Sequence, residues 1–237
     1  MKIKRILIFF AIVIILIDLA YFYPKLAGKT TYSREFVNVT KVIDGDTIDT
    51  SIGKVRLLGI NTPEKNQPYY EEAKAFLKQY EGKQVEIERA KEDKDKYNRF
   101  LRYIFYNKIF INQEILKQGL ANLYVYSEDK YTQALKEAES SAQNQEKALW
   151  KKSINYGCLE LIKLKYLEET RCNNQEQLIL NNKCNNLNVI LKDDANHIYQ
   201  INLEPGTFVK NFSCVFNDEG DSLSVRDKDG LLLYYHY

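Results

Sequence analysis

Residues 36–60 read FVNVTKVIDGDTIDTSIGKVRLLGI and contain three short runs rich in β-branched and aliphatic residues. The runs cover residues 36–43, 47–52 and 54–60, and the breaks between them contain Asp-Gly and Gly-Lys pairs, which favour turns. Short runs with such breaks predict neighbouring β-strands joined by tight connections. This stretch therefore indicates that the domain it begins is built on a small β-sheet.

Two further segments extend the predicted sheet. Residues 84–88 form another short run, and residues 99–106 and 108–111 look like one more hairpin that turns at Asn107. About five short strands are typical of a small closed barrel. The predicted fold class is mainly β with α.

Three segments with apolar residues at helical spacing are predicted to be helices. The first covers residues 70–80 and ends before Gly82. Asn112 is expected to cap a second helix, over residues 113–118, because asparagine accepts hydrogen bonds from free amides at a helix start. A third is predicted from about residue 130 to residue 150.

The composition is that of a globular protein rather than of a disordered chain. Hydrophobic residues make up 45% and charged residues 28% of the 237 residues, so both halves of the chain can bury a core. That length suits two domains, since domains usually run to about 100 to 150 residues. The net charge of +2 is too small to indicate a nucleic-acid partner, which must be argued from particular residues.

The amino terminus is predicted to be a membrane anchor or a signal segment, residues 1–24. A basic start precedes an apolar run, residues 6–23, which is broken only by Asp18 and is about long enough to cross a bilayer. No small-x-small cleavage site follows, which favours an uncleaved anchor; a buried core helix is the alternative. Residues 25–35 are polar and are predicted to be a linker.

The cysteines are confined to the last third of the chain. They are even in number, which favours two disulfides in an oxidising compartment, and they are Cys158, Cys172, Cys184 and Cys214. A four-cysteine zinc site is the alternative, although no C-x-x-C pair is present. With the amino-terminal segment, this predicts a single-pass membrane protein whose domains lie outside the cytoplasm, or a secreted protein. The pairing stays open.

Three segments combine residue types that suit phosphate chemistry. Residues 42–48, VIDGDTI, place two carboxylates around a glycine, which alone would indicate only a hairpin turn. Residues 56–64, RLLGINTPE, lead from a strand into a loop with a guanidinium, an amide, a hydroxyl and a carboxylate. Residues 95–99, DKYNR, add a second arginine.

Together these segments resemble the thermonuclease (staphylococcal nuclease) family, whose sequences carry D-G-D-T, R-L-L-x-x-D-T-P-E and D-x-Y-G-R in this order. The resemblance covers about residues 36–150, within a domain predicted at residues 36–152. It implies a five-stranded OB-fold barrel with helices. It also implies a calcium-dependent enzyme that hydrolyses phosphodiester bonds of DNA or RNA.

The resemblance assigns the catalytic roles to three residues. Arg56 and Arg99 would bind the scissile phosphate, because guanidinium groups stay charged and bind two oxygens at once. Glu64 would orient or deprotonate the attacking water. Nucleotide contacts would come from Lys96, Tyr97 and Tyr124. For the tyrosines, simple packing is the alternative, since the chain has 18 of them.

The same resemblance implies a calcium site. Asp46, the side chain at position 61 and the backbone carbonyl of Thr62 would supply the hard oxygen ligands that calcium takes. Asn61 stands where the family usually has aspartate, so we expect weaker calcium binding because one negative charge is missing. Asn98 stands where the family usually has glycine, and asparagine enters the left-handed backbone region more readily than most residues.

From Cys158 on, short alternating runs and asparagine-rich loops indicate a second domain, residues 158–237. Residues 191–199, 203–206 and 221–230 resemble the lamin-tail domain, which implies an immunoglobulin-like β-sandwich. His197 is expected to be structural. The partner of this domain is not identified by the sequence.

Two other classes of function stay open. One is a non-catalytic OB module that only binds single-stranded nucleic acid, which would not need Arg56, Glu64 and Arg99 together. The other is a surface adhesion or scaffold protein with a vestigial nuclease domain, for which Asn61 is the best support. We expect the protein to be a monomer.

The cysteine pattern generates a direct prediction. All four thiols should be oxidised in protein recovered from the native membrane or medium, because an even set in a small extracytoplasmic domain forms disulfides. Mass spectrometry after alkylation without reductant checks this. Four alkylated thiols would contradict the extracytoplasmic placement, and bound zinc would replace the disulfides.

Overall fold

The computed structural model describes residues 34–125, 127–166, 176–194, 197–213, 215–216 and 221–237. The predicted anchor and most of the predicted linker lie outside these residues. In the part of the chain that is described, no helix is both long and apolar enough to cross a membrane.

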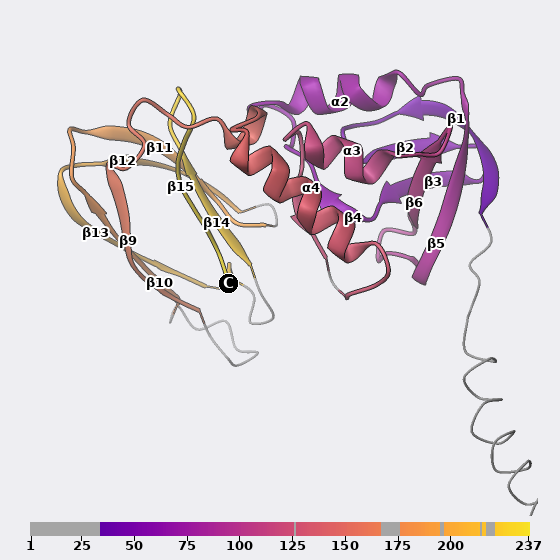
Figure 1. Cartoon of the computed structure of the whole chain (residues 1–237). Coiled ribbons are helices and arrows are strands. Elements are labelled where there is room, and N and C mark those ends of the chain that lie inside the picture. The colour runs from indigo at the N-terminus through magenta and orange to yellow at the C-terminus, as the bar shows by residue number, and fades with distance from the viewer. Residues whose placement is uncertain (1–33, 126, 167–175, 195–196, 214, 217–220) are drawn as a thin grey trace, which may run out of the picture. The chain divides into compact units, whose positions relative to one another are not determined.

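The first described domain is a closed β-barrel with helices beside it (Figure 1). Its strands are β1 (Glu35–Val42), β2 (Thr47–Thr50), β3 (Gly53–Leu57), β5 (Gln84–Lys94) and β6 (Phe100–Tyr106). They follow the order β3-β2-β1-β5-β6, and parallel pairing of β3 with β6 closes the sheet. This confirms a mainly β chain with a five-stranded closed barrel, consistent with the predicted OB-fold.

Three short strands accompany the barrel, namely β4 (Gly59–Asn61), β7 (Ile109–Phe110) and β8 (Asn122–Tyr124). The predicted hairpin is confirmed, since β6 pairs with β7 and Asn107 and Lys108 both have positive φ in the turn. The predicted strand at residues 54–60 divides in two at Gly59. Its φ is +75°, and a Cβ there would lie 2.4 Å from Leu135 Cδ1, so only glycine fits.

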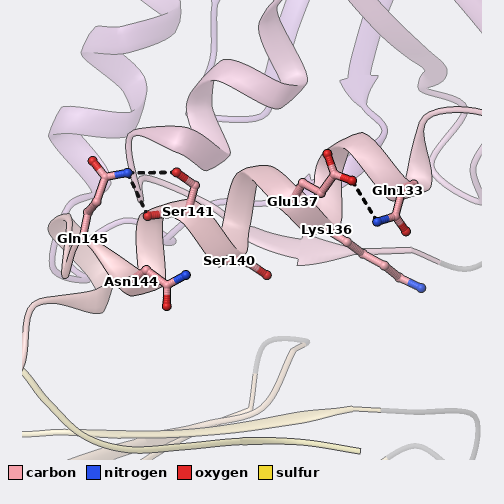
Figure 2. A pocket seen from close by; sticks show the side chains of 7 residues that line it. All are labelled: Gln133, Lys136, Glu137, Ser140, Ser141, Asn144 and Gln145. Atoms are coloured by element: carbon pink, nitrogen blue, oxygen red, sulfur yellow. Dashed lines mark hydrogen bonds between the residues drawn. The ribbon is translucent and has the colours of Figure 1, made fainter.

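The helices of this domain are α2 (Tyr70–Lys78), α3 (Ile111–Lys117) and α4 (Thr132–Asn144), followed by a 3₁₀ turn, η1 (Ala148–Trp150). The third predicted helix is shorter than expected, because Glu146 and Ala148 have positive φ and end the regular helix. On its outer face, α4 carries polar side chains that bond to one another, such as Gln133 to Glu137 at 3.0 Å (Figure 2).

The predicted cap at Asn112 is wrong. Asn112 lies inside α3 and is fully buried. Its Oδ1 accepts from the backbone N of Ile104 at 2.9 Å, and its Nδ2 donates to the carbonyl of Leu58 at 2.8 Å. The side chain thus bonds one backbone group of β6 and one of the turn between β3 and β4, and it fixes α3 to the barrel.

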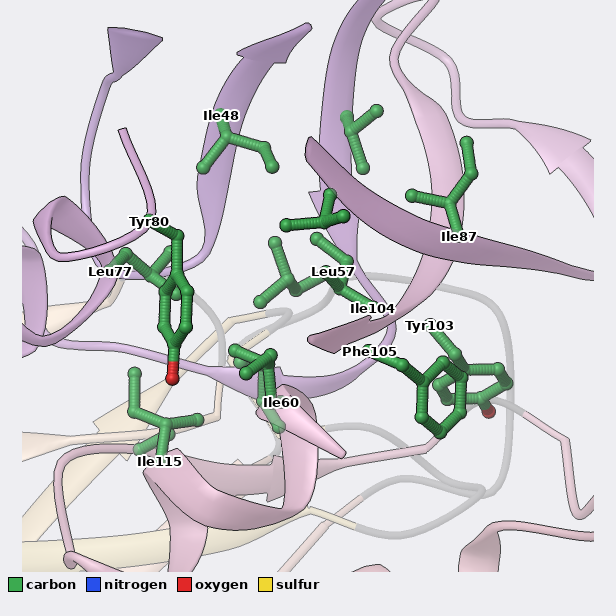
Figure 3. Close-up of a cluster of buried hydrophobic side chains, with 14 of the residues drawn as sticks. Ile48, Leu57, Ile60, Leu77, Tyr80, Ile87, Tyr103, Ile104, Phe105 and Ile115 are labelled. Carbon is green, nitrogen blue, oxygen red and sulfur yellow. The ribbon is translucent and has the colours of Figure 1, made fainter. Parts of the chain in front are cut away.

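Side chains from all five barrel strands and from the helices fill the barrel core. Figure 3 shows aliphatic groups meeting around the barrel axis, beside an aromatic group formed by Tyr103 and Phe105. Phe105 stacks on Phe110 with ring centroids 4.8 Å apart, and Tyr131 packs 4.8 Å from Phe110. Each large side chain removed from water here stabilises the fold by about 1.5 to 3 kcal/mol. Those labelled in the view are Ile48, Leu57, Ile60, Leu77, Tyr80, Ile87, Tyr103, Ile104, Phe105 and Ile115.

The second described domain consists of two antiparallel sheets. One has the order β13-β10-β9 and the other β12-β11-β14-β15. A single buried cluster takes side chains from both sheets, so the sheets share one core. The strands are β9 (Leu159–Lys165), β10 (Glu176–Asn182), β11 (Leu187–Lys192), β12 (Ile198–Leu203), β13 (Gly206–Phe212), β14 (Ser222–Arg226) and β15 (Leu231–His236).

One disulfide is present in the described residues. It joins Cys158 to Cys184, and so links the residue before β9 to the loop after β10. This confirms a disulfide in the second domain. Cys172 and Cys214 lie outside the described residues, so the second predicted disulfide stays a prediction.

Backbone and aromatic contacts join the two domains. Leu231 N donates to the carbonyl of Lys151 at 2.8 Å, and Ser153 N donates to the carbonyl of Leu231 at 2.9 Å. Trp150 meets the ring of Tyr234 edge-on, with centroids 4.7 Å apart. The connection between the domains is therefore an edge segment paired to β15 rather than a free linker.

Glu139, on α4, is a buried carboxyl that titrates near neutrality. Its Oε1 accepts from Leu123 N at 2.7 Å, and Glu139 is only 7% exposed. Burial raises the pKa of Glu139 from 4.5 to about 7; the bond from Leu123 opposes this and the charge of Asp194 adds to it. The folded state therefore favours the neutral form of the Glu139 carboxyl.

We predict that the free energy of unfolding falls as pH rises from about 4.5 to 7, because the unfolded chain ionises Glu139 before the folded chain does. The loss from this group is at most roughly 3 kcal/mol. Glu139→Gln keeps the acceptor for Leu123 N and removes the titration, so its stability should fall less over this range and exceed that of the original chain at pH 8. Urea unfolding at several pH values checks this, and parallel curves for the two proteins would contradict it.

Candidate active site

The turn between β1 and β2 places two carboxylates close together. Asp44 Oδ1 accepts from the backbone N of Asp46 at 3.1 Å. A Cβ on the intervening Gly45 would lie 2.7 Å from Cβ of Ala73 and 2.8 Å from Oγ1 of Thr62. The glycine therefore allows the turn to lie directly against α2 and against the loop after β4.

Asp46 connects three separate segments of the barrel. Its Oδ2 accepts from the backbone N and from Oγ1 of Thr62, each at 3.0 Å. Oδ1 accepts from Oγ1 of Thr47 at 2.9 Å, and Nη2 of Arg56 lies 3.2 Å from Oδ2. This carboxylate is 7% exposed, so its negative charge is stabilised by these donors rather than by bulk water.

Arg56 is fixed from several directions. Its Nη1 donates to the carbonyls of Leu57 and Ile60 at 2.6 and 2.8 Å, and its Nη2 donates to Oδ1 of Asn61 at 3.1 Å. The side chain keeps 12% of its surface exposed. Protein oxygens therefore occupy both Nη groups, so the guanidinium is fixed in position and a phosphate would replace some of these bonds.

Arg99 reaches the same region from the segment before β6. Its Nε lies 2.6 Å from Oδ2 of Asp95, and its Nη1 is 3.5 Å from Oγ1 of Thr47, the residue that also bonds Asp46. Asn98 has a φ of 62°, which confirms that asparagine serves in the left-handed conformation where the family usually has glycine. Pairing of β3 with β6 thus brings the two predicted arginines around one threonine.

Glu64 lies two residues after Thr62, and its side chain is exposed. Its backbone N donates to Oε1 of Gln67 at 3.0 Å. The charge of Glu64 also acts on Lys192, at the end of β11 in the second domain: burial lowers the pKa of Lys192, and nearby carboxylates including Glu64 oppose that shift. The carboxylate is therefore accessible, and the second domain lies within its electrostatic reach.

The predicted nucleotide contacts differ in their surroundings. Tyr97 is 68% exposed, with Nζ of Lys96 at 5.2 Å and Cζ of Arg99 at 5.3 Å from its ring centroid. An exposed ring between two cations suits stacking on a base beside a phosphate. Tyr124 is half-buried at the end of β8, where it pairs with Gly59.

Three residues of the site had no role assigned from the sequence. Asp44 packs beside Asp46, Thr47 bonds both Asp46 and Arg99, and Asp95 holds Arg99. All three belong to the motifs D-G-D-T and D-x-Y-G-R, so these motifs could have indicated them. Burial, followed by the charge of Asp46, raises the pKa of Asp44 to about 6.

The oxygen atoms of the site fit a hard divalent cation. No group of three or more His, Cys, Asp or Glu side chains that could hold a metal occurs among the described residues, so a zinc-type cluster is absent from that part of the chain. The available donors are the carboxylates of Asp44 and Asp46, the amide of Asn61 and the carbonyl of Thr62, all of them oxygen. Burial raises the pKa of Asp44, and the negative charge of Asp46 raises it further; a cation would compensate that charge.

A hollow of about 420 Å³ on α4 is a separate feature (Figure 2). None of the predicted site residues lines it. Its side chains bond within the helix, as Gln145 Nε2 does to Ser141 Oγ at 2.8 Å. We therefore assign no chemistry to this hollow.

Comparison with known proteins identifies relatives of the barrel domain. Residues 54–152 match the family model described as staphylococcal nuclease homologue. The chain is 34% identical over 138 residues to thermonuclease of Staphylococcus hyicus, covering 53% of this chain and 82% of that protein. It is 34% identical over 141 residues to thermonuclease of Staphylococcus intermedius, covering 54% and 84%. Endonuclease YncB of Bacillus subtilis (strain 168) is 36% identical over 137 residues, covering 51% and 64%.

Proposed function

The chain belongs to the staphylococcal nuclease family, and we propose that it is a calcium-dependent endonuclease that cleaves DNA or RNA outside the cytoplasm. At the level of the family it is a hydrolase of phosphodiester bonds, and nucleic acid is its substrate. The observation that carries the proposal is the arrangement of Arg56 and Arg99 around Asp46 and Thr47. Nucleic-acid binding alone does not require two fixed guanidinium groups beside a buried carboxylate.

The two arginines bind the scissile phosphate and stabilise its transition state. Attack on phosphorus increases the negative charge on the non-bridging oxygens, and two oriented guanidinium groups offset that charge. Arg56 is oriented by three backbone and side-chain oxygens, and Arg99 by Asp95. Removing one such contact typically costs about 2.7 to 4 kcal/mol of transition-state stabilisation.

Glu64 is the group that handles the proton of the attacking water. Its exposed carboxylate, two residues from Thr62, can accept a hydrogen bond from water in front of the phosphate. The water oxygen forms a bond to phosphorus, the bond from phosphorus to the 5′ oxygen breaks, and the leaving oxygen takes a proton. The products then end in a 3′-phosphate and a 5′-hydroxyl.

Asp46, Asn61 and the backbone carbonyl of Thr62 would hold the calcium ion, with Asp44 beside them. When bound, calcium supplies positive charge next to the phosphate. The neutral amide of Asn61 weakens the affinity relative to a carboxylate, but dissociation constants of about 0.1 to 1 mM serve extracellular calcium modules.

Contacts to the nucleotide come from Lys96, Tyr97 and Tyr124. The exposed ring of Tyr97 stacks on a base, and Lys96 beside it meets the backbone charge. The Cys158–Cys184 disulfide supports an extracytoplasmic location, on the membrane through residues 1–24 or after secretion. Two antiparallel sheets around one core support a lamin-tail-like identity for the second domain.

We predict that the purified full chain degrades single-stranded DNA and RNA when calcium is added and stops when a chelator removes it. End-group analysis should find 3′-phosphates. Glu64→Gln, prepared in the same way, is the control for contaminating nucleases. Undiminished hydrolysis in chelator would contradict the metal assignment, and 5′-phosphate ends would indicate a different mechanism.

Arg56→Lys, Arg99→Lys and Glu64→Gln should each lower kcat by at least about a hundredfold, because each removes a contact made in the transition state. Arg89→Lys is a matched control, since Arg89 is an exposed arginine on β5 whose carboxylate partner, Asp93, lies 3.8 Å away. It should leave kcat unchanged. Thermal unfolding of each variant shows whether the fold is kept; near-normal turnover in all three site variants would exclude this site.

A further inference from the structure

Asn61 is hydrogen-bonded to both domains. Its Oδ1 accepts from Nη2 of Arg56 at 3.1 Å, and its Nδ2 donates to the backbone carbonyl of Asp194 at 2.7 Å. A guanidinium can only donate and a carbonyl can only accept, so the two partners fix which end of the amide is oxygen. The side chain therefore connects the phosphate-binding arginine to a residue 133 positions later in the chain.

This pair of partners explains why an amide stands at position 61. An ionised aspartate has two acceptor oxygens and no donor, so it could bond Arg56 but would face the carbonyl of Asp194 with a second acceptor. Two acceptors in contact at a half-buried position are unfavourable. Asparagine is the residue of the same shape that satisfies both partners at once.

Asp194 is itself held by other residues of the second domain. Its backbone N donates to Oδ1 of Asp221 at 2.9 Å, and the same oxygen accepts from Ser222 N at 2.7 Å. Ser222 Oγ also bonds Oδ1 of Asp194. Asp221 and Asp194 are buried, at 0% and 8% exposure, so these bonds are shielded from water.

Contacts from β14 and β15 also hold the second domain against the barrel domain. Arg226, at the end of β14, donates through Nη2 to the carbonyl of Leu149. Leu231 packs with Ala142 of α4 and with Trp150 in a small buried cluster. The bond from Asn61 to Asp194 is thus one of several contacts between the two domains.

We propose that the second domain is a positioning part of the nuclease site: the carbonyl of Asp194 holds Asn61, and Asn61 holds the guanidinium of Arg56. Asp194 and Asn61 are positioning residues in this role, since Arg56 is the group that meets the phosphate. The effect on catalysis rests on the function proposed above. The link between the domains, from Asp194 through Asn61 to Arg56, does not depend on that function.

The test uses the full chain and a change made only in the second domain. Asp221→Ala removes the acceptor that fixes the Asp194 loop, whereas Asp221→Asn keeps an acceptor oxygen. Asn182→Ala is the matched control, because Asn182 is equally buried and organises a different loop by accepting from Cys184 N at 3.0 Å. Hydrogen exchange and kcat at saturating calcium and substrate are measured for each variant.

Asp221→Ala should increase amide exchange in residues 59–64 relative to β5 of the same protein, and should lower kcat by about five- to tenfold, the size expected for one lost hydrogen bond. Asp221→Asn should restore both, and Asn182→Ala should change neither. Asn61→Ala should lower kcat by at least this factor, because it also removes the proposed calcium ligand and the acceptor for Arg56. Adding Asp221→Ala to Asn61→Ala should cause little further loss, because the link that Asp221 supports is already broken.

Other results would overturn the proposal. These are unchanged exchange in residues 59–64 with Asp221→Ala, an equal effect of Asn182→Ala, or multiplicative losses in the double variant. If Asp221→Ala does not fold, Asn61→Asp provides the test, since it keeps the side-chain volume and puts an acceptor in place of the donor to Asp194, although it also adds a negative charge. It should raise exchange in residues 59–64, and unchanged exchange would contradict the link. If the original chain cleaves no nucleic acid, the proposed function fails and the exchange results still decide the link.

Discussion

The buried carboxylate of Asp46 is the interaction on which the rest of the site depends. Taking a carboxylate out of water costs several kcal/mol unless charges and hydrogen bonds replace the lost hydration. Here Thr47, Thr62 and Arg56 supply them, and each comes from a different segment of the barrel. The order of the sheet makes this arrangement possible, because β2 lies between β1 and β3 and the turn at Gly45 fits against α2. The same group therefore ties together the fold and the proposed phosphate site.

The position of Arg56 follows from this constraint. Its charge compensates Asp46, and its Nη1 donates to the carbonyls of Leu57 and Ile60. The bonds that stabilise the barrel thus also fix where the guanidinium lies, and an anion would replace some of them. Arg99 differs, because among the described residues its side chain bonds Asp95 and the more distant Thr47, and its guanidinium lies beside the exposed ring of Tyr97. The site consequently combines one rigid cation with one that can adjust to its ligand.

The sequence predicted the features that depend on residues close together in the chain. The short strands, the hairpin at Asn107 and the left-handed Asn98 are local. Three contiguous motifs pointed to Asp46, Arg56 and Arg99, which the structure brings close together. It failed where tertiary contacts decide. Asn112 has the residue type and position of a helix cap, but its side chain bonds the backbone of Ile104 and Leu58 in the interior. The bond from Asn61 to Asp194 is equally invisible to local patterns, since the partner is a backbone carbonyl of another domain.

The exchange of a carboxylate for an amide at position 61 has two opposite consequences. A neutral group attracts a divalent cation less strongly than a carboxylate does, and at an effective dielectric constant of about 20 that difference amounts to a few kcal/mol before desolvation. The amide gains a donor in return, and with it a bond that no carboxylate can make to Asp194. Because Asp44 and Asp46 already repel each other in the neighbouring turn, a third carboxylate would add to that repulsion whenever the cation is absent. The amide therefore gives up part of the attraction for the cation, and in exchange the loop that carries Thr62 and Glu64 is held by the second domain even without the metal.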